Sequence, residues 1–369
     1  MYIKHLSIVN YKNILQAELD FSSGINCFVG NNGTGKTNLL DSIYYLSFCK
    51  SYFNPVDSQV INHGEDFFVV QGSYERNSID ENIYAGLKRD HKKQFKRNKK
   101  EYVKLSEHIG LLPLVMVSPA DERLITDGSE QRRRYIDSVI SQFDKSYLDN
   151  LLRYNRALIQ RNTLLKKSRS LEGNIASQFD VWDAQLALSG AVIFEKRQRF
   201  INDIIPVFND YYAAISGESE KVDMIYHSHH KKGDLMELLQ QNRERDLILG
   251  YTTKGIHRDD LELLLNKYPV RHDGSQGQKK SFLIALKFAQ YGFLYTQNDI
   301  APILLLDDIF DKLDHERGER LIKLVGNNYF KQIFITDTQK ERLVHIVSET
   351  GKEYRLFETC NGNVQTVYE

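Results

Sequence analysis

Hydrophobic and polar residues alternate along the first third of the chain with the period of β-strands. Leu6 and Ile8 stand on either side of a polar residue, and Leu19 and Phe21 repeat the pattern. Because successive side chains of a strand point to opposite faces of a sheet, this spacing predicts half-buried strands. Further strands are predicted at the apolar runs Phe67–Val70, Asn82–Leu87 and Leu114–Val117. The first third is therefore expected to be rich in β-sheet.

Between residues 120 and 250, apolar residues recur every three or four positions, which is the period of an α-helix. The clearest examples are Tyr147, Leu151, Tyr154 and Leu158. Pro206 and Gly217 are expected to be the main interruptions of the helical pattern. No heptad repeat is sustained, so the segment predicts a helical arm without a long coiled coil.

After residue 250 the pattern alternates between strand and helix. Strands are predicted at Leu261–Leu265, Pro302–Leu306 and Gln332–Thr336, and a helix at Gln278–Leu294. Such alternation favours an α/β sheet. We therefore expect residues 1–119 and 251–369 to form the two halves of one head domain, with residues 120–250 inserted as the arm.

Composition narrows the class of protein only slightly. The chain has 369 residues and a formal net charge of +0, so its total charge does not indicate nucleic acid. No apolar stretch approaches the ~18 residues of a membrane span, and the N-terminus has no signal-peptide core. The three cysteines lack metal-type spacing and suit a reducing compartment. We expect a cytoplasmic protein without membrane partners.

Two local clusters of basic residues are more informative than the total charge. The first comprises Lys88, Arg89, Lys92, Lys93, Lys96, Arg97, Lys99, Lys100 and Lys104, with Asn98 as a plausible turn between two strands. The second comprises Arg153, Arg156, Arg161, Lys166, Lys167 and Arg169. Either cluster can follow a phosphate backbone, because local positive surface sets such contacts. The alternative is a solvated hairpin and a solvated helix face.

A glycine-rich segment at residues 30–37 has the spacing of a phosphate-binding loop, Gly-x-x-x-x-Gly-Lys-Thr, between an apolar run and a predicted helix. Glycines let backbone N–H groups point at phosphate oxygens, and the following helix adds its positive end. Lys36 is expected to neutralise the β- and γ-phosphates and Thr37 to bind Mg²⁺. The predicted nucleotide contacts are Gly30, Asn31, Asn32, Gly33, Thr34, Gly35, Lys36, Thr37 and Asn38. A glycine-rich turn with a chance Lys-Thr is the alternative.

A phosphate-binding loop needs acidic residues for the metal and for water, and candidates for these lie near the other end of the chain. The apolar run Ile303–Leu306 ends at Asp307 and Asp308. Carboxylates at the carboxyl end of a parallel strand face the crevice where α/β sheets bind ligands. Asp307 is therefore expected to hold Mg²⁺, and Asp308 to act as general base toward water. Paired acids at a strand end can also cap a helix or bind a structural cation.

A third element, Ser275-Gln276-Gly277-Gln278, stands immediately before a predicted helix. By composition alone Ser275 is an ordinary N-cap. Together with glycine N–H groups and a helix N-terminus, it also forms an anion site that the phosphate loop of the same chain does not need. Such a site makes sense if Ser275, Gly277 and Gln278 close over the γ-phosphate held by a second subunit.

Taken together, these motifs resemble the ABC-type ATPase heads of the SMC-like DNA-repair proteins and, among them, the RecF family of bacterial recombination mediators. The resemblance spans nearly the whole chain. It includes Asn10–Asn13, Gly30–Leu40, Ser118–Asp121, Gln131–Asp137, Tyr154–Arg156, Gln160–Asn162, Gly255–Leu261, Ser275–Gln278, Leu306–Asp308 and Asp311–Asp314.

The resemblance implies a homodimer that forms on ATP and binds DNA at the edges of single-strand gaps. It implies work with RecO and RecR to place RecA on DNA, in replication, recombination, repair and the SOS response to damage. It also implies weak, DNA-stimulated ATP hydrolysis that acts as a switch. By the same resemblance, Lys36 and Thr37 belong to Walker A, Asp307 and Asp308 to Walker B, residues 275–278 to the signature acting on the partner's nucleotide, and residues 311–314 to an interface loop.

Several positions depart from the family pattern. Lys12, an expected nucleotide contact, and Lys280 stand where the family usually has Arg, so only a point charge remains. Ala120 replaces an acid. Where a switch histidine is usual, Thr336 or Thr338 is the candidate γ-phosphate contact. Asp308 replaces the Glu of most ABC ATPases, which fits slow turnover.

Residues 257–260, His-Arg-Asp-Asp, are expected to form a structural ion-pair network between arm and head. A metal or acid-base site is the alternative, but one His without a second imidazole is a weak metal signal. The histidines at 227, 229 and 230 are interpreted as part of a solvated loop. Two other functions share the nucleotide motifs: the ATPase subunit of an ABC transporter, and a binding module whose nucleotide only stabilises the fold.

Overall fold

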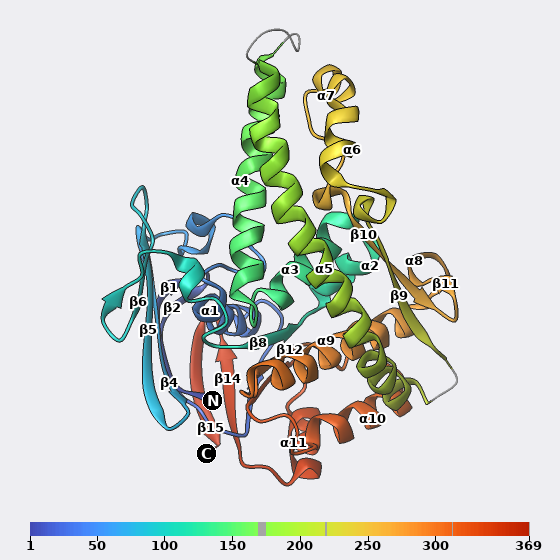
Figure 1. The fold of residues 1–369 in the computed structure, drawn as a ribbon. Helices are drawn as coiled ribbons and strands as arrows, with labels where there is room; N and C mark the ends of the chain where they lie inside the picture. The colour runs from blue at the N-terminus through green and yellow to red at the C-terminus, as the bar shows by residue number, and fades with distance from the viewer. Residues whose placement is uncertain (169–174, 218–219, 312, 369) are drawn as a thin grey trace. The chain divides into compact units, whose positions relative to one another are not determined.

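The computed structural model describes residues 1–168, 175–217, 220–311 and 313–368 (Figure 1). The chain divides into two compact units. The first unit comprises Met1–Glu122, Tyr211–Ser219 and Ser275–Glu369, and the second comprises Arg123–Asp210 and Glu220–Gly274. Among the described residues, no helix combines the length and apolar character needed to cross a membrane.

The first unit contains an antiparallel sheet of six strands in the order β2-β1-β4-β5-β6-β7. Its strands are β1 (Tyr2–Tyr11), β2 (Ile14–Asp20), β4 (Phe67–Arg76), β5 (Ile79–Lys88), β6 (Gln94–Arg97) and β7 (Lys100–Glu101). Asn98 and Lys99 connect β6 to β7 with φ values of 50° and 70°. Two successive positive φ angles are typical of a tight hairpin turn, so the predicted turn at Asn98 is confirmed.

A second sheet of the first unit brings together strands from both ends of the chain. Its order is β15-β14-β3-β13-β12-β8, and β14, β3, β13, β12 and β8 run parallel. The strands are β3 (Ile25–Val29), β8 (Leu114–Val117), β12 (Ile303–Asp307), β13 (Ile333–Asp337), β14 (Tyr354–Cys360) and the antiparallel β15 (Asn363–Tyr368). Cys27 is opposite Ile335, and Ile335 is opposite Leu306. The residues that follow β3 and β12 therefore meet at one edge.

Helix α1 (Lys36–Phe48) packs in the core that both sheets share. Leu39 and Ile43 of α1, Phe68 of the antiparallel sheet and Leu305 of the parallel sheet are all buried in one cluster. The parallel sheet also packs against α9 (Gln276–Asn298), which lies along β8, and α11 (Lys340–Thr350), which contacts α10 (His315–Gly326). The α/β architecture expected from the sequence is thus present.

The second unit is mainly helical. It contains α2 (Arg123–Thr126), α3 (Ser129–Ile140), α4 (Lys145–Lys167), most of α5 (Ile175–Ser216), α6 (Leu235–Gln241), α7 (Arg243–Leu249) and α8 (Val270–Asp273). A small sheet adds β9 (Val222–His227), β10 (Asp260–Leu265) and β11 (Tyr268–Pro269). Because β10 pairs with β9, the segment up to Gly274 groups with the helices. The expected domain boundaries at residues 120 and 250 stay predictions.

The predicted interruption of the helical pattern at Pro206 is wrong, whereas the one at Gly217 is confirmed. Helix α5 passes through Pro206 and ends at Ser216, where Gly217 adopts a φ of 90°. Proline removes one backbone hydrogen bond. Ile204 and Phe208 on either side of it are fully buried, and this packing holds the helix together across the missing bond.

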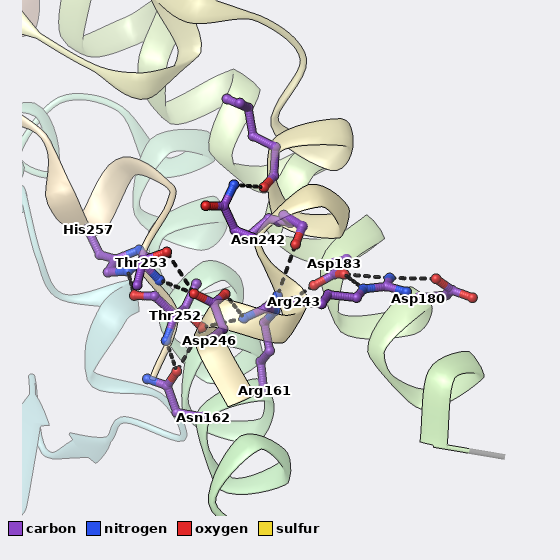
Figure 2. Close-up of polar contacts among 12 residues, drawn as sticks. Arg161, Asn162, Asp180, Asp183, Asn242, Arg243, Asp246, Thr252, Thr253 and His257 are labelled. Carbon is purple, nitrogen blue, oxygen red and sulfur yellow. Dashed lines mark hydrogen bonds and ion pairs between the residues drawn. The ribbon is translucent and has the colours of Figure 1, made fainter. Parts of the chain in front are cut away.

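A fully buried arginine joins three helices of the second unit (Figure 2). Arg161 of α4 donates from Nε to Asp183 of α5 at 2.5 Å and from Nη1 to Asp246 of α7 at 2.7 Å. Both carboxylates have no exposed surface, and Arg243 extends the network by bonding Asp183. The network satisfies charges that would otherwise be costly to bury.

We predict that Arg161→Leu destabilises the second unit by about 3–5 kcal/mol, because the buried carboxylate of Asp246 loses its arginine and that of Asp183 keeps only Arg243. Denaturant unfolding followed by fluorescence measures this change, since the single tryptophan, Trp182, lies in α5 of the same unit. Arg153→Leu on the exposed side of α4 is the matched control. Equal midpoints for the two variants would contradict the prediction.

Candidate functional site

The loop between β3 and α1 has the conformation that its glycines allow. Gly33 and Gly35 have φ values of 82° and 116°, in the left-handed region that other residues rarely adopt. Gly30 has a different role, because a Cβ at this position would lie 2.4 Å from the carbonyl oxygen of Thr359. The loop therefore packs closely against Thr359 of β14 before the chain enters α1.

Lys36 is buried within this loop. Its Nζ donates to the carbonyl oxygens of Gly30 at 2.6 Å and Asn31 at 3.0 Å. These bonds hold the ammonium inside the curve of the loop, beside the N-terminus of α1. Positive charge, backbone N–H groups and a helix N-terminus at one place form a site for an anion such as a polyphosphate.

Asn13 supports the loop from outside and was not among the predicted site residues. Its Nδ2 donates to the carbonyl of Gly33 at 3.1 Å, and its Oδ1 accepts from Asn38 at 2.7 Å. The resemblance included Asn13 within a motif, but the spacing of the motif gave no indication of this contact. Asn13 thus fixes both the loop and the first turn of α1.

Thr37 and Asp307 join the two ends of the chain by a hydrogen bond. The Thr37 hydroxyl lies 2.9 Å from Oδ1 and 3.1 Å from Oδ2 of Asp307. Thr336 donates to Oδ1 at 2.8 Å and Ser118 to Oδ2 at 3.4 Å, so hydroxyl groups surround the carboxylate. Burial raises the pKa of Asp307, and the hydroxyl bonds oppose that rise.

The donor atoms at this position suit Mg²⁺. A hydroxyl and a carboxylate provide only oxygen ligands, which magnesium prefers, and magnesium commonly takes one or two protein ligands beside phosphate oxygens. Thr37 and Asp307 are the residues that would hold it. The same two residues were predicted from their separate motifs.

Asp308 follows Asp307 in a left-handed conformation with a φ of 46°. Its backbone N–H donates to the Thr336 hydroxyl at 3.0 Å, and its side chain lines a cavity of about 290 Å³ together with Gln276 and Asp311. Burial raises the pKa of Asp308, and the nearby carboxylates of Asp337 and Asp311 add to the rise. A carboxylate at a cavity wall can accept a proton from water there.

Ser275 caps α9. Its hydroxyl accepts from the N–H of Gln278 at 3.2 Å, and the Gln278 side chain accepts from the N–H of Ser275 at 2.8 Å. This is a capping box, as the N-cap interpretation expected. Ser275 is also exposed, so its surface is open to another molecule.

Comparisons with known proteins identify the family. Residues 2–352 match the model of the RecF/RecN/SMC N-terminal domain. The DNA replication and repair protein RecF of Parabacteroides distasonis is 54% identical over 369 residues and 100% of both chains. RecF of Bacteroides fragilis is 53% identical over 370 residues, covering 100% of this chain and 99% of that protein. The chain belongs to the RecF family.

Solved structures agree with this assignment. A structure of the recombination mediator RecF with ATP, from the RecFOR pathway, superposes with a TM-score of 0.88 and 31% identity, and covers 99% of this chain and 97% of that chain. The Smc head of Pyrococcus furiosus matches over 100% of this chain and 96% of that chain, with a TM-score of 0.59 and 17% identity, which shows the fold alone. The predicted fold class, an SMC-like ABC-type head, is confirmed.

Two residues of this RecF-family chain that were predicted to contact the nucleotide, Lys12 and Thr336, bond other side chains of the protein instead. Lys12 forms an ion pair with Asp41 at 2.7 Å, and its side chain is only 13% exposed. Thr336 is fully buried, and its hydroxyl bonds Asp307 and the N–H of Asp308. Thr338, the other candidate γ-phosphate contact, is exposed and stays a prediction. Lys280 donates to the carbonyls of Asp308 and Asp311.

The expected interface loop at 311–314 is only partly described, because Lys312 lies outside the described residues. Asp314 accepts from the N–H of Arg317 at 2.9 Å and caps α10. Asp311 lines the cavity beside Asp308.

The ion pairs predicted at residues 257–260 are present. Their partners lie within the second unit, so the predicted coupling of arm to head stays a prediction. Asp259 pairs with Arg197 at 3.1 Å and Asp260 with Arg132 at 2.8 Å. His257 contacts the hydroxyl of Tyr154 at 2.8 Å. The described part of the chain contains no group of three or more His, Cys, Asp or Glu side chains arranged to hold a metal. The structure supports the network rather than the metal alternative.

The two basic clusters differ in how their charges are used. In the hairpin, Lys93 pairs with Asp57 at 2.6 Å and Arg97 with Glu81. On α4, the charge of Arg161 is paired with buried carboxylates. Arg169 of this cluster lies outside the described residues. The exposed members are Arg153, Arg156, Lys166 and Lys167, none of which makes an ion pair or hydrogen bond to a described residue. In the hairpin, Lys88, Lys92, Lys99, Lys100 and Lys104 are likewise exposed and make no ion pair to a described residue, so both clusters keep exposed positive charge.

We predict that the stability of the second unit decreases as pH falls from about 6.5 toward 4. Burial lowers the pKa of His257 to about 4, whereas an unfolded His titrates near its ordinary value. The unfolded chain then binds a proton that the folded chain does not, so the free energy of unfolding rises with pH across this interval. Urea unfolding at several pH values measures this change in the free energy of unfolding.

The control for this prediction is His272→Gln, which removes an exposed histidine of the same unit. His257→Gln is expected to reduce the pH dependence, and His229 and His230, whose pKa values burial also lowers, cause part of what remains. His272→Gln is expected to leave it in place. An unchanged slope in His257→Gln would show that other groups cause the pH dependence.

Proposed function

We propose that this protein is an ATP-dependent DNA-binding protein of recombinational repair that dimerises when it binds ATP. It binds DNA at single-strand gaps or junctions, and with RecR and RecO it promotes loading of RecA in the cytoplasm. ATP hydrolysis is slow and DNA-stimulated, and it returns the protein to the unbound state. The family assignment supports a role in DNA replication and repair, and the structures of relatives with ATP support the nucleotide.

The Thr37–Asp307 hydrogen bond is the observation that carries this proposal. It joins the phosphate loop to the carboxylate of Asp307, the proposed magnesium ligand, with Asp308 adjacent at the same edge of the sheet. Magnesium, when bound there, supplies positive charge to the β- and γ-phosphates. Lys36 adds a second cation, and Asp308 orients water and accepts its proton. The shorter reach of Asp relative to Glu supports slow hydrolysis.

The signature at residues 275–278 supports a role for dimerisation. Lys36 and the loop amides surround one side of a phosphate within one chain, while the exposed Ser275 at the N-terminus of α9 offers a separate anion site. We propose that Ser275 of one chain closes over the nucleotide of the other.

We predict that Asp308→Asn retains ATP and accumulates as an ATP-bound dimer on DNA, because water is no longer deprotonated. Hydrolysis should fall by roughly 100-fold or more, in line with the loss of a general base. Phosphate release and sedimentation velocity measure the two effects. Asp299→Asn, an exposed Asp of the same unit, is the control. Normal turnover in Asp308→Asn would contradict the assigned role.

We predict that Ser275→Arg binds ATP normally but no longer dimerises, because the bulky cation blocks the surface that meets the partner. Equilibrium nucleotide binding and light scattering separate the two properties. Ser348→Arg adds the same charge at an exposed position of α11 and should leave both unchanged. If Ser275→Arg kept ATP binding, dimerisation and DNA binding alike, the nucleotide would have only a structural role.

The exposed basic residues of α4 are our proposed DNA contacts. The double variant Arg153→Gln/Arg156→Gln should reduce the dependence of log affinity on log salt by about 2, or about 1 for each phosphate contact. The matched variant Lys99→Gln/Lys100→Gln changes two exposed lysines of the hairpin. Fluorescence anisotropy with gapped duplex measures both. A larger effect of the hairpin variant would assign the DNA to the hairpin.

A further inference from the structure

A buried polar cluster lies behind the Asp307 carboxylate and is built from Tyr52, Asp121 and Lys287. Asp121 is 4% exposed and pairs with the Lys287 ammonium of α9 at 2.7 Å. Tyr52 donates its hydroxyl hydrogen to Asp121, and Lys287 donates to the Tyr52 hydroxyl at 3.2 Å. The three side chains come from three separate segments of the first unit.

Ser118 connects this cluster to the candidate metal site. The second carboxylate oxygen of Asp121 accepts the backbone N–H of Ser118 at 2.8 Å. The hydroxyl of the same Ser118 donates to Oδ2 of Asp307 at 3.4 Å. Asp121 therefore fixes the backbone of the residue whose side chain reaches the metal-binding carboxylate.

The cluster is also tied to α1. The backbone N–H of Tyr52 donates to Oδ1 of Asp41 at 2.7 Å, and Asp41 is the fully buried partner of Lys12. Polar contacts thus run without interruption from Lys12 through Asp41, Tyr52 and Asp121 to Ser118.

The buried ion pair of Asp121 and Lys287 costs desolvation free energy, which indicates a role other than stabilising the fold. Burying an ion pair removes two charges from water, and apolar residues of similar volume often give equal or greater stability. Packing alone therefore does not require Asp121 and Lys287. What the pair does provide is a rigid, directional acceptor for the N–H of Ser118.

We propose that Asp121 is a positioning residue for the metal site: held by Lys287 and Tyr52, it orients Ser118 and through it the Asp307 carboxylate. This inference rests on the proposed function. Lys287 lies on α9, the helix capped by Ser275, roughly three turns further along. If contact of a second chain with Ser275 displaced α9, Lys287 would move with the helix. The movement would then change the position of Asp307 through Asp121 and Ser118.

The test is a magnesium titration of the full-length protein with a non-hydrolysable ATP analogue, read as nucleotide affinity. Asp121→Asn should raise the Mg²⁺ concentration at half-saturation by about tenfold, the usual range for residues that orient metal ligands. Ser118→Ala should do the same. The double variant should be no worse than either single variant, because Asp121 acts through Ser118.

Hydrogen exchange without metal or nucleotide is a second readout. The Ser118 amide should exchange faster in Asp121→Asn, since its acceptor is weakened. Glu81→Gln is the matched control, because it neutralises a buried carboxylate of the same unit that is also ion-paired, in this case with Arg97. The control should change neither magnesium dependence nor Ser118 exchange.

Should Asp121→Asn fail to fold because Lys287 loses its buried carboxylate, Tyr52→Phe and Asp121→Asn/Lys287→Met provide the same test without that loss of charge balance. Unchanged half-saturation in variants that fold, or additive effects of Asp121→Asn and Ser118→Ala, would overturn the inference while leaving the proposed function intact. If wild-type protein bound no nucleotide at any Mg²⁺ concentration, both would fail together.

Discussion

The hydrogen bond between the Thr37 hydroxyl and the Asp307 carboxylate is the constraint on which the site depends. It joins residues 270 positions apart and requires β3, β13 and β12 to lie side by side in register. Once these strands are aligned, Lys36, Asp308 and Thr336 follow at the same edge of the sheet. The arm can therefore be inserted between the two motifs without separating them.

Buried charges specify the geometry in both units. In the second unit, Arg161 and Arg197 each bond two carboxylates, which fixes the relative positions of its helices and of the segment that contains Asp259. In the first unit, the buried ion pair of Asp121 and Lys287 fixes α9 relative to the segment that contains Ser118. Such pairs add little net stability but permit few alternative arrangements, because any misplacement leaves a charge unpaired.

Local motifs predicted the parts of the structure that depend on local chemistry. The phosphate loop, the strand ending at Asp307 and the capped helix at Ser275 were recognisable because each has its own spacing. Pro206 was misread because propensity was considered without the burial of Ile204 and Phe208. The partner of β10 and the cluster around Asp121 could not be read from the sequence, since both depend on contacts between distant segments. Composition also could not show that the guanidinium of Arg161 is buried and ion-paired whereas that of Arg156 on the same helix is exposed.

The central claim is that one chain contains an incomplete nucleotide site that a second copy completes. Mixing Lys36→Ala, which lacks the phosphate-binding lysine, with Ser275→Arg, which lacks the signature, tests this claim directly. A heterodimer of the two contains one intact composite site, formed by the loop of one chain and Ser275 of the other. We expect each variant alone to be inactive and the mixture to regain ATP-dependent dimers and ATP hydrolysis. A mixture no more active than its separate components would contradict the account.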